Sequence, residues 1–221
     1  MKEIRENLWS VLSDYGYNEA PMDVHHSPDT LERLERAEQL KLTGKHEEAL
    51  VILEQLLMED PENVPALEEV ADNELSLNHV HRAERAAKEA ISICGRSYTA
   101  HYILGFLRSQ EKRWTEALRE LREANNLNPN NPEILRCLGW ALFQYGKHAQ
   151  GVVTLERALN LDQENALILC DLGVAYAEAH NIKKAASLFT RAVEIDPGNA
   201  RARECIKMVQ RLGKPTERVV R

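Results

Sequence analysis

Small and large apolar residues recur along this chain with a period of 34 residues. One column of small residues contains Ala37, Ala71, Gly105, Gly139 and Gly173. A column of larger residues contains Val70, Leu104, Leu138 and Leu172. A fixed period of this length is typical of repeat proteins, in which each unit buries its apolar face against its neighbours. The pattern therefore predicts a stack of similar units.

Two kinds of helix-breaking signal divide each unit. A strong signal closes four of the units: Asp60-Pro61-Glu62-Asn63, Asn128-Pro129-Asn130-Asn131, Asp162-Gln163-Glu164-Asn165 and Asp196-Pro197-Gly198-Asn199. Weaker breaks fall near Gly44, Asn78, Lys112, Gly146 and His180-Asn181. Because proline stops a helix and asparagine caps the next one, each unit should contain two helices of about three to four turns. Ser97 is expected to be the cap at the end of the second unit, which lacks the proline.

This segmentation predicts three parts of the chain. Five repeats fill residues 30–199, as 30–63, 64–97, 98–131, 132–165 and 166–199. Residues 200–221 should form a polar capping helix, over 200–212, and a tail. Apolar residues at helical spacing predict an amphipathic helix over residues 2–14, followed by a linker that completes residues 1–29.

Composition limits the class of protein further. Ala, Leu, Glu and Arg outnumber the strand-forming residues, which favours an all-α fold. No apolar run approaches the roughly 18 residues of a membrane span. No secretory signal is recognised, so a cytoplasmic protein is expected. The four cysteines (Cys94, Cys137, Cys170 and Cys205) lack zinc-knuckle spacing and are interpreted as free thiols.

Charge argues against a nucleic-acid partner and differs between the two halves of the chain. The formal net charge is -7, whereas binding to phosphates requires an excess of Lys and Arg. Residues 1–110 carry a net charge of -10 and residues 111–221 a net charge of +3. An acidic beginning could therefore meet a basic end of a second copy.

The columns resemble the tetratricopeptide repeat. The third unit carries this pattern as Leu104-Gly105, Trp114, Ala117, Leu121, Ala124 and Pro129. The fifth unit carries it as Leu172-Gly173, Tyr176, Ala185, Phe189, Ala192 and Pro197. The resemblance covers residues 30–199 and implies a right-handed α-solenoid of helix-turn-helix repeats.

A helical wheel for the first helix of the third unit separates two faces. Leu104 and Gly105 face the second helix, whereas Tyr102 and Phe106 lie on an arc about 150° away, which lines the concave surface of such a stack. The equivalent positions supply the candidate peptide-binding groove: Tyr102, Phe106, Arg136, Trp140, Phe143, Glu38, Glu68 and Asp72. Grouped aromatic residues with arginine are typical of binding hot spots. The alternatives are packing between first helices for the aromatic set and a solvated surface for the carboxylates.

This groove suits a partner that has basic residues next to bulky apolar ones. Some tetratricopeptide domains clamp a C-terminal carboxylate with Lys and Asn, but the matching places here hold Leu34, Glu38 and Glu69. A carboxylate clamp is therefore not expected.

The sequence offers no catalytic constellation, and no metal site or cofactor is predicted. The pairs His25-His26 and His79/His81 lack an obvious third ligand at helical spacing. We therefore expect a non-enzymatic protein-interaction module that receives a peptide or helix. Two alternatives remain open: a scaffold that self-assembles head to tail or through its N-terminal helix, and a chaperone for a secreted client.

Overall fold

The computed structural model describes residues 27–212, with side chains up to residue 209. These residues form eleven helices, and no strand occurs among them. The predicted all-α class is confirmed for this part of the chain. The helix predicted over residues 2–14 and the tail after residue 212 lie outside the described residues. The described helices belong to two compact units, which meet in sequence at Pro129 and Asn130.

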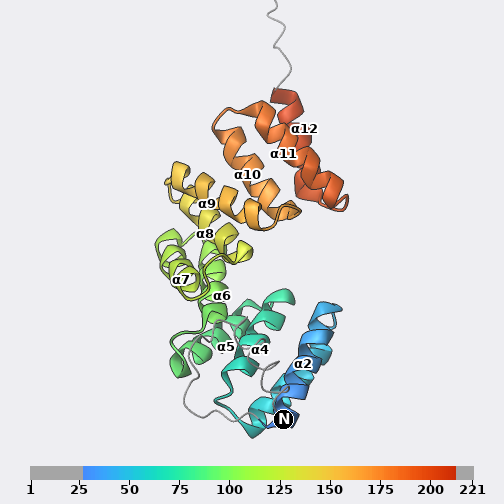
Figure 1. Ribbon diagram of the computed structural model, residues 1–221, viewed down its shortest axis with the longest axis vertical. Coiled ribbons are helices and arrows are strands. Elements are labelled where there is room, and N and C mark those ends of the chain that lie inside the picture. The colour runs from blue at the N-terminus through green and yellow to red at the C-terminus, as the bar shows by residue number, and fades with distance from the viewer. Residues whose placement is uncertain (1–26, 213–221) are drawn as a thin grey trace, which may run out of the picture. The chain divides into compact units, whose positions relative to one another are not determined.

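The first unit, residues 27–129, contains three helical hairpins. Its helices are α2 (Pro28–Leu42), α3 (His46–Glu59), α4 (Val64–Ser76), α5 (Val80–Ile93), α6 (Tyr98–Gln110) and α7 (Trp114–Leu127). Each odd-numbered helix packs against the helix before it, and α3 and α5 also contact the helix after them (Figure 1). The first helices of successive hairpins, α2, α4 and α6, are neighbours as well. They therefore form one continuous face of this unit.

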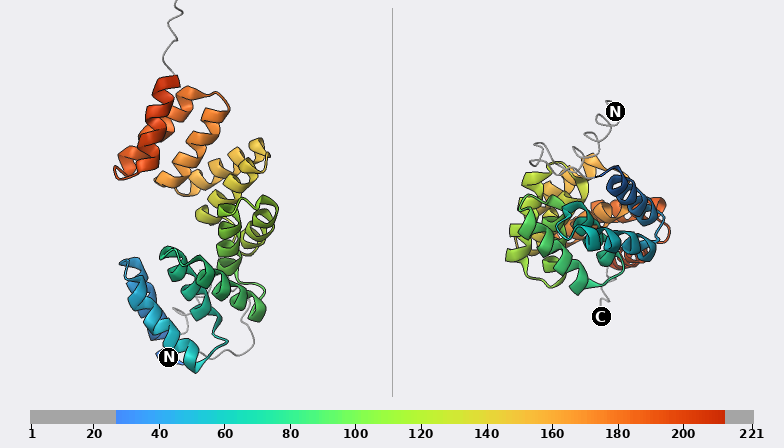
Figure 2. Two further views of the ribbon diagram at one scale, coloured as in Figure 1. Left: turned by 180° about the vertical axis from the view of Figure 1, so that it is seen from behind. Right: turned by 90° about the horizontal axis from the view of Figure 1, so that it is seen from below.

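The second unit, residues 130–212, contains two hairpins and a single helix. Its helices are α8 (Pro132–Gln144), α9 (His148–Leu161), α10 (Ala166–Glu178), α11 (Ile182–Ile195) and α12 (Ala200–Leu212). Helix α12 packs against α11 and also contacts α10 (Figure 2). It thus occupies the place that the first helix of another hairpin would take. No helix among residues 27–212 is long and apolar enough to cross a membrane.

Helix starts repeat with the predicted period because their capping residues do. Asn63, Ser97, Asn131 and Asn165 precede first helices, and each side chain accepts a hydrogen bond from a backbone N–H of the first turn. Asn199 does the same for α12, with 3.0 Å between its Oδ1 and the backbone nitrogen of Ala202. These bonds satisfy N–H groups that have no partner within the helix.

The turns inside the hairpins share a left-handed residue at one repeat position. Positive φ angles occur at Gly44, Asn78, Lys112, Gly146 and His180, between 59° and 93°. Such a residue closes the end of a helix while its neighbours complete the last backbone hydrogen bonds. The weaker breaks seen in the sequence are therefore real turns.

The small-residue column lies where the two helices of a hairpin cross. A Cβ atom built on Gly105 would lie 2.6 Å from Cγ of Leu121. A Cβ atom on Gly139 would lie 2.8 Å from Cγ of Leu155. Both distances are too short for real atoms, so glycine is what permits this close approach of the helix axes.

Candidate peptide-binding faces

The face of the first unit that α2, α4 and α6 form carries two aromatic side chains. Tyr102 and Phe106 lie one turn apart on α6, with ring centroids separated by 6.4 Å, and both are partly exposed. They pack on the core cluster that also carries the partly buried Leu34 on α2 and Leu75 on α4. The structure thus places two of the predicted groove residues side by side. Each ring packs partly on the apolar core and remains partly accessible to solvent.

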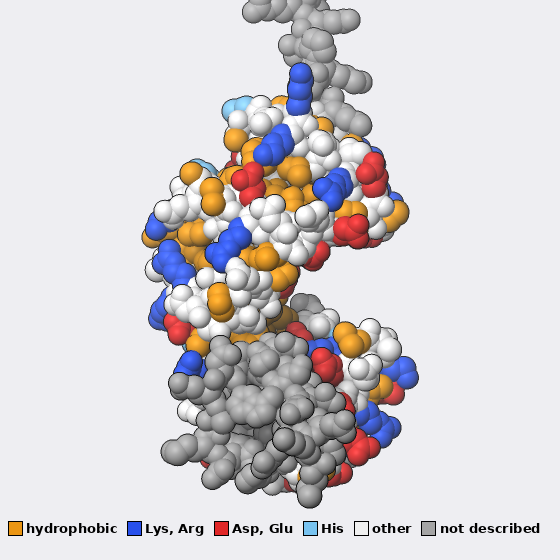
Figure 3. Space-filling model, viewed as in Figure 1, with side chains coloured by type: hydrophobic (Ala, Val, Ile, Leu, Met, Phe, Trp, Pro, Cys, Tyr) orange, Lys and Arg blue, Asp and Glu red, His pale blue; other side chains and the backbone are white. Residues whose placement is uncertain are grey.

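On the neighbouring first helices, two acidic side chains of α4 pair with a lysine of α2. Nζ of Lys41 lies 2.8 Å from Oε2 of Glu69 and 3.0 Å from Oδ2 of Asp72. Although burial disfavours its charge, these two carboxylates hold the pKa of Lys41 above its ordinary value. Glu38 lies close enough to act on Glu69 electrostatically. Asp and Glu side chains stand next to Lys and Arg along α2 in Figure 3.

Glu68, another predicted groove carboxylate, is buried instead of lining the surface. It is 5% exposed, and the hydroxyl of Ser97 donates a hydrogen bond to it. Burial raises the pKa of Glu68 to about 7, and repulsion by Glu69 adds to the effect. Because Ser97 is also the cap of α6, Glu68 supports the start of the helix that carries Tyr102 and Phe106.

The second unit has an aromatic pair on α8, in which Trp140 holds the repeat position of Phe106. The rings of Trp140 and Phe143 stack with centroids 6.1 Å apart. Phe143 is only 3% exposed, because it packs against Gly151 of α9 and makes a T-shaped contact with the His148 ring, with centroids 4.6 Å apart. Trp140 is partly exposed. Of this predicted pair, only Trp140 therefore offers surface, and Phe143 supports it from below.

Arg136 stands one turn before Trp140 and is held by carboxylates on two helices. Its Nε lies 2.9 Å from Oε2 of Glu133, and its Nη1 lies 3.0 Å from Oδ2 of Asp171 on α10. Although burial opposes the charge, the hydrogen bonds of Glu133 and the charge of Asp171 keep the pKa of Arg136 above its ordinary value. Arg136 is thus held in place, and with its side chain only 12% exposed it offers less surface than the sequence predicts.

Sequence reasoning missed two residues that contact Arg136 or Trp140, the buried Asp171 and the half-exposed Arg201. The Asp171 side chain is 2% exposed, and its second oxygen, Oδ1, lies 3.1 Å from Nη1 of Arg201 on α12. The guanidinium carbon of Arg201 lies 5.5 Å from the centroid of the Trp140 ring. The repeat pattern carries no signal for this contact, because Arg201 lies beyond the five predicted repeats.

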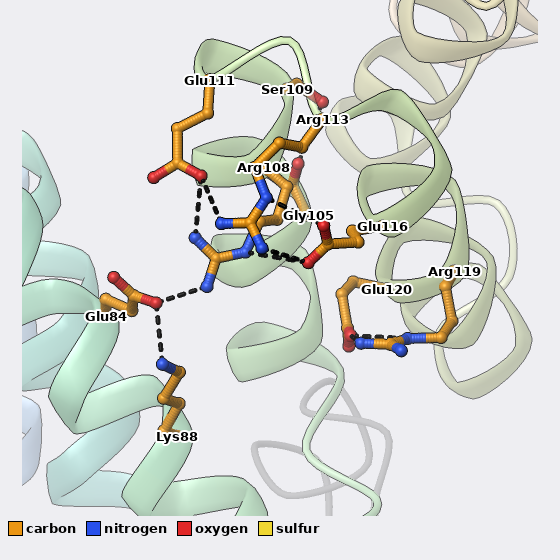
Figure 4. A network of polar contacts seen from close by, with 10 residues as sticks. All are labelled: Glu84, Lys88, Gly105, Arg108, Ser109, Glu111, Arg113, Glu116, Arg119 and Glu120. Atoms are coloured by element: carbon orange, nitrogen blue, oxygen red, sulfur yellow. Dashed lines mark hydrogen bonds and ion pairs between the residues drawn. The ribbon is translucent and has the colours of Figure 1, made fainter.

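A separate polar network joins α5, α6 and α7 in the first unit (Figure 4). Arg108 donates to Glu84 of α5, and its Nη1 lies 3.1 Å from Oε2 of Glu111. Lys88 and Arg108 hold the pKa of Glu84 well below its ordinary value, at about 2. The network ties the hairpin of α4 and α5 to the hairpin of α6 and α7.

The described residues contain few groups suited to chemistry. No cluster of three potential metal ligands occurs among residues 27–212. All four cysteines are free thiols, and burial raises the pKa of Cys137 to about 12 and of Cys170 to about 11. Both groups therefore stay protonated and unreactive near neutral pH.

Paired helices that recur every 34 residues, with small residues at each crossing, define a helical repeat protein. Within this class, residues 109–199 match the tetratricopeptide repeat. Family models described as "Tetratricopeptide repeat" match residues 109–170 and 166–199. Proteins of this fold are generally non-catalytic modules that bind other proteins.

Comparison with solved structures shows the same fold over most of the chain. A thermophilic TPR protein of Thermus thermophilus is 22% identical, with a TM-score of 0.65, covering 81% of this chain and 98% of that one. YrrB, a TPR protein with an unusual peptide-binding site, is also 22% identical, with a TM-score of 0.57, covering 79% of this chain and 90% of that one.

One curated protein is related in sequence over a shorter stretch. The peroxisomal targeting signal receptor of Saccharomyces cerevisiae is 30% identical over 83 residues. The matched stretch is 38% of this chain and only 14% of the receptor.

Proposed function

We propose that this chain binds a peptide or helix of a partner protein on the faces formed by its first helices, without catalysing a reaction. The bound segment would combine basic with bulky apolar side chains. The observation that carries this proposal is the arrangement on α2, α4 and α6. There the rings of Tyr102 and Phe106 are partly exposed on α6, and Asp72 on α4 and Glu38 on α2 hold the repeat position that Phe106 holds on α6.

Each set of residues has a role in this proposal. Tyr102 and Phe106 would contact apolar side chains, since partly exposed aromatic residues lose water readily on binding. Asp72 and Glu38 would attract basic side chains and set the orientation of the segment. Glu68 would act indirectly, through the cap of α6.

The second unit would contribute a separate contact area around Trp140, fixed in place by Phe143 and Arg136. In both units the side chains stand on packed helices, so little conformational entropy is lost when a partner binds. That YrrB has a peptide-binding site on the same fold is consistent with this proposal. We also propose a cytoplasmic location, in keeping with the four free thiols.

A peptide-display selection against the full chain would test the proposal. We expect enrichment of peptides in which Arg or Lys adjoins Leu, Phe or Trp. Binding of a selected peptide should be weakened in Phe106→Ala or Trp140→Ala. It should be unchanged in Met58→Ala and Val153→Ala, which remove exposed apolar side chains from the second helices α3 and α9. Peptides that depend on Met58 or Val153 instead would contradict the proposed faces.

The division of charge supports a second candidate function, head-to-tail self-assembly. The net charges of -10 and +3 in the two halves of the chain would attract opposite ends of two copies. Light scattering should then show a mass that rises with protein concentration and falls as salt rises from about 10 to about 500 mM. A constant monomer mass at low salt would end this candidate. Chaperone activity toward a secreted client stays a prediction from the sequence alone.

A further inference from the structure

One cluster of the second unit combines an ion-pair network with an aromatic ring and consists of Asp171, Arg136, Trp140 and Arg201. Its members differ in how firmly they are held. Asp171 is buried on α10, and Arg136 is anchored by Glu133 as well as by Asp171. Arg201 reaches in from the first turn of α12 and is 49% exposed. It is therefore the one member of this cluster that can leave by changing its own rotamer.

Charge balance in the cluster depends on Arg201. With Arg201 present, two guanidinium groups face the carboxylates of Glu133 and Asp171. When the Arg201 side chain swings into solvent, Oδ1 of Asp171 loses its ion-pair partner and the cluster gains one net negative charge. A buried carboxylate oxygen without a partner costs free energy, so the position that the Arg201 guanidinium has left would favour another cation.

The geometry around Arg201 favours a guanidinium over an ammonium group. The Arg201 guanidinium donates to Oδ1 of Asp171 and lies over the ring of Trp140 at the same time. A flat group with several N–H donors can pair with a carboxylate and stack on an indole together. An ammonium group is a compact, strongly hydrated charge and makes the second contact less well.

From these observations we propose that Trp140, Asp171 and Arg136 form an arginine-binding subsite, which the side chain of Arg201 fills in the free protein. A partner's arginine would replace Arg201, and Arg201 would turn into solvent. This inference rests on the proposed function, because it names the basic side chain that the second unit receives. It also makes Arg201 a built-in competitor that weakens binding of partners lacking arginine.

The test uses the full chain with Arg201→Ala and the probes N-acetyl-arginine amide and N-acetyl-lysine amide. Binding is followed by the NMR signal of the Trp140 indole N–H, assigned with Trp140→Phe. We expect saturable binding of the arginine probe to Arg201→Ala, at least about tenfold tighter than that of the lysine probe. We also expect at least about tenfold weaker binding of the arginine probe to the parent protein, in which Arg201 competes. Measurement at pH 8 favours the ionised form of Asp171.

Matched variants make the test specific. Arg203→Ala removes an exposed arginine of the same helix, which donates to the backbone oxygen of Gly198, and should bind like the parent. Asp171→Asn in the Arg201→Ala background should abolish binding of the arginine probe. If Arg201→Ala does not fold, judged by circular dichroism, Arg201→Gln is used with the same expectations.

Equal binding of the two probes, or equal binding to the parent and to Arg201→Ala, would overturn the subsite. This failure differs from failure of the proposed function. If selected peptides still require Phe106 while the arginine probe does not bind, the subsite is wrong and the function stands. If the probe binds to Arg201→Ala and no peptide is selected, the subsite stands and the peptide-binding function is wrong.

Discussion

A Cβ atom placed on Gly173 would lie 2.5 Å from Cε1 of Phe189, so the ring of Phe189 fills the space that any other residue at position 173 would need. Gly173 lies on α10 and Phe189 on α11, sixteen residues later. The same offset joins Gly105 to Leu121 and Gly139 to Leu155. The crossing of each of these hairpins is thus fixed by one glycine and one large apolar residue.

Gly173→Ala should lower the free energy of unfolding by about 1–3 kcal/mol, because the new methyl group overpacks the crossing. Urea denaturation of the variant and its parent measures the difference. Gly95→Ala is the control, since a Cβ there has no atom closer than 4.0 Å. Phe189→Leu should recover part of the loss in the Gly173→Ala background, and a strictly additive double mutant would contradict this contact.

Lys112→Gly should raise the free energy of unfolding by about 0.5–1 kcal/mol. Lys112 has φ of 60° in the turn between α6 and α7, a conformation that costs L-residues energy and suits glycine. Gly44 and Gly146 already occupy the equivalent turns. Lys112→Ala is the matched control and should give no gain, because alanine is strained there as well. A gain for alanine equal to that for glycine would mean that loss of the lysine charge is responsible.

Loss of the proton on Glu68 should lower the free energy of unfolding as pH rises from about 4.5 to about 7. The folded state raises the pKa of Glu68 to about 7, so it binds the proton more tightly than the unfolded chain does, and stability is lost as that proton leaves. Glu68→Gln removes this titration while keeping an acceptor for Ser97. Its free energy of unfolding should exceed that of the parent by about 2–3 kcal/mol more at pH 8 than at pH 4.5. Parallel stability profiles of the two proteins would refute this.

Arg108→Met should destabilise the first unit by about 1–3 kcal/mol, since it leaves Glu84 without its partner between hairpins. Arg113→Met is matched to it, because Arg113 contacts the same Glu111 and Glu116 from an exposed position. Exposed ion pairs contribute little, so Arg113→Met should cost less than about 1 kcal/mol. Chemical denaturation at low and high salt would compare them, and equal costs would show that the link to Glu84 adds nothing.

Phe106→Ala should weaken binding of a selected peptide by about 2–4 kcal/mol while helix content stays near the parent value. The reason is that Phe106 is partly exposed, in contrast to the core residues around it. Asp72→Lys should mainly slow association and change its salt dependence, because a partly exposed carboxylate steers a basic partner. Calorimetry and stopped-flow kinetics give these two readouts. Loss of folding in Phe106→Ala would instead indicate a core residue.

The helices and their ends could be predicted because they depend on local chemistry. Asn63, Asn131 and Asn165 cap helices through their own side chains, and Gly44 and Gly146 adopt positive φ without strain. These signals need no knowledge of distant contacts. A regular period then places the small residues at the crossings.

The candidate binding faces were harder to predict, because the exposure of a side chain depends on neighbouring helices that a helical wheel omits. Phe143 is buried because Gly151 leaves room for it, and Glu68 is buried beside the cap of the next first helix. Arg201 contacts Trp140 although the two positions are 61 residues apart in the sequence. Only the packing of α8, α10 and α12 brings these groups together.

Helix α12 begins 34 residues after α10, behind an asparagine cap of the same kind, so the chain resumes the opening half of a hairpin at residue 200. Residues 166–199 therefore form one complete repeat, which is preceded by the asparagine cap Asn165 and ends with the asparagine cap Asn199. Inserting a second copy of this repeat after residue 199 would recreate each junction with its natural neighbours. Since repeat arrays gain stability from each new interface, the lengthened protein should unfold at a higher denaturant concentration. The architecture thus lends itself to growth by duplication.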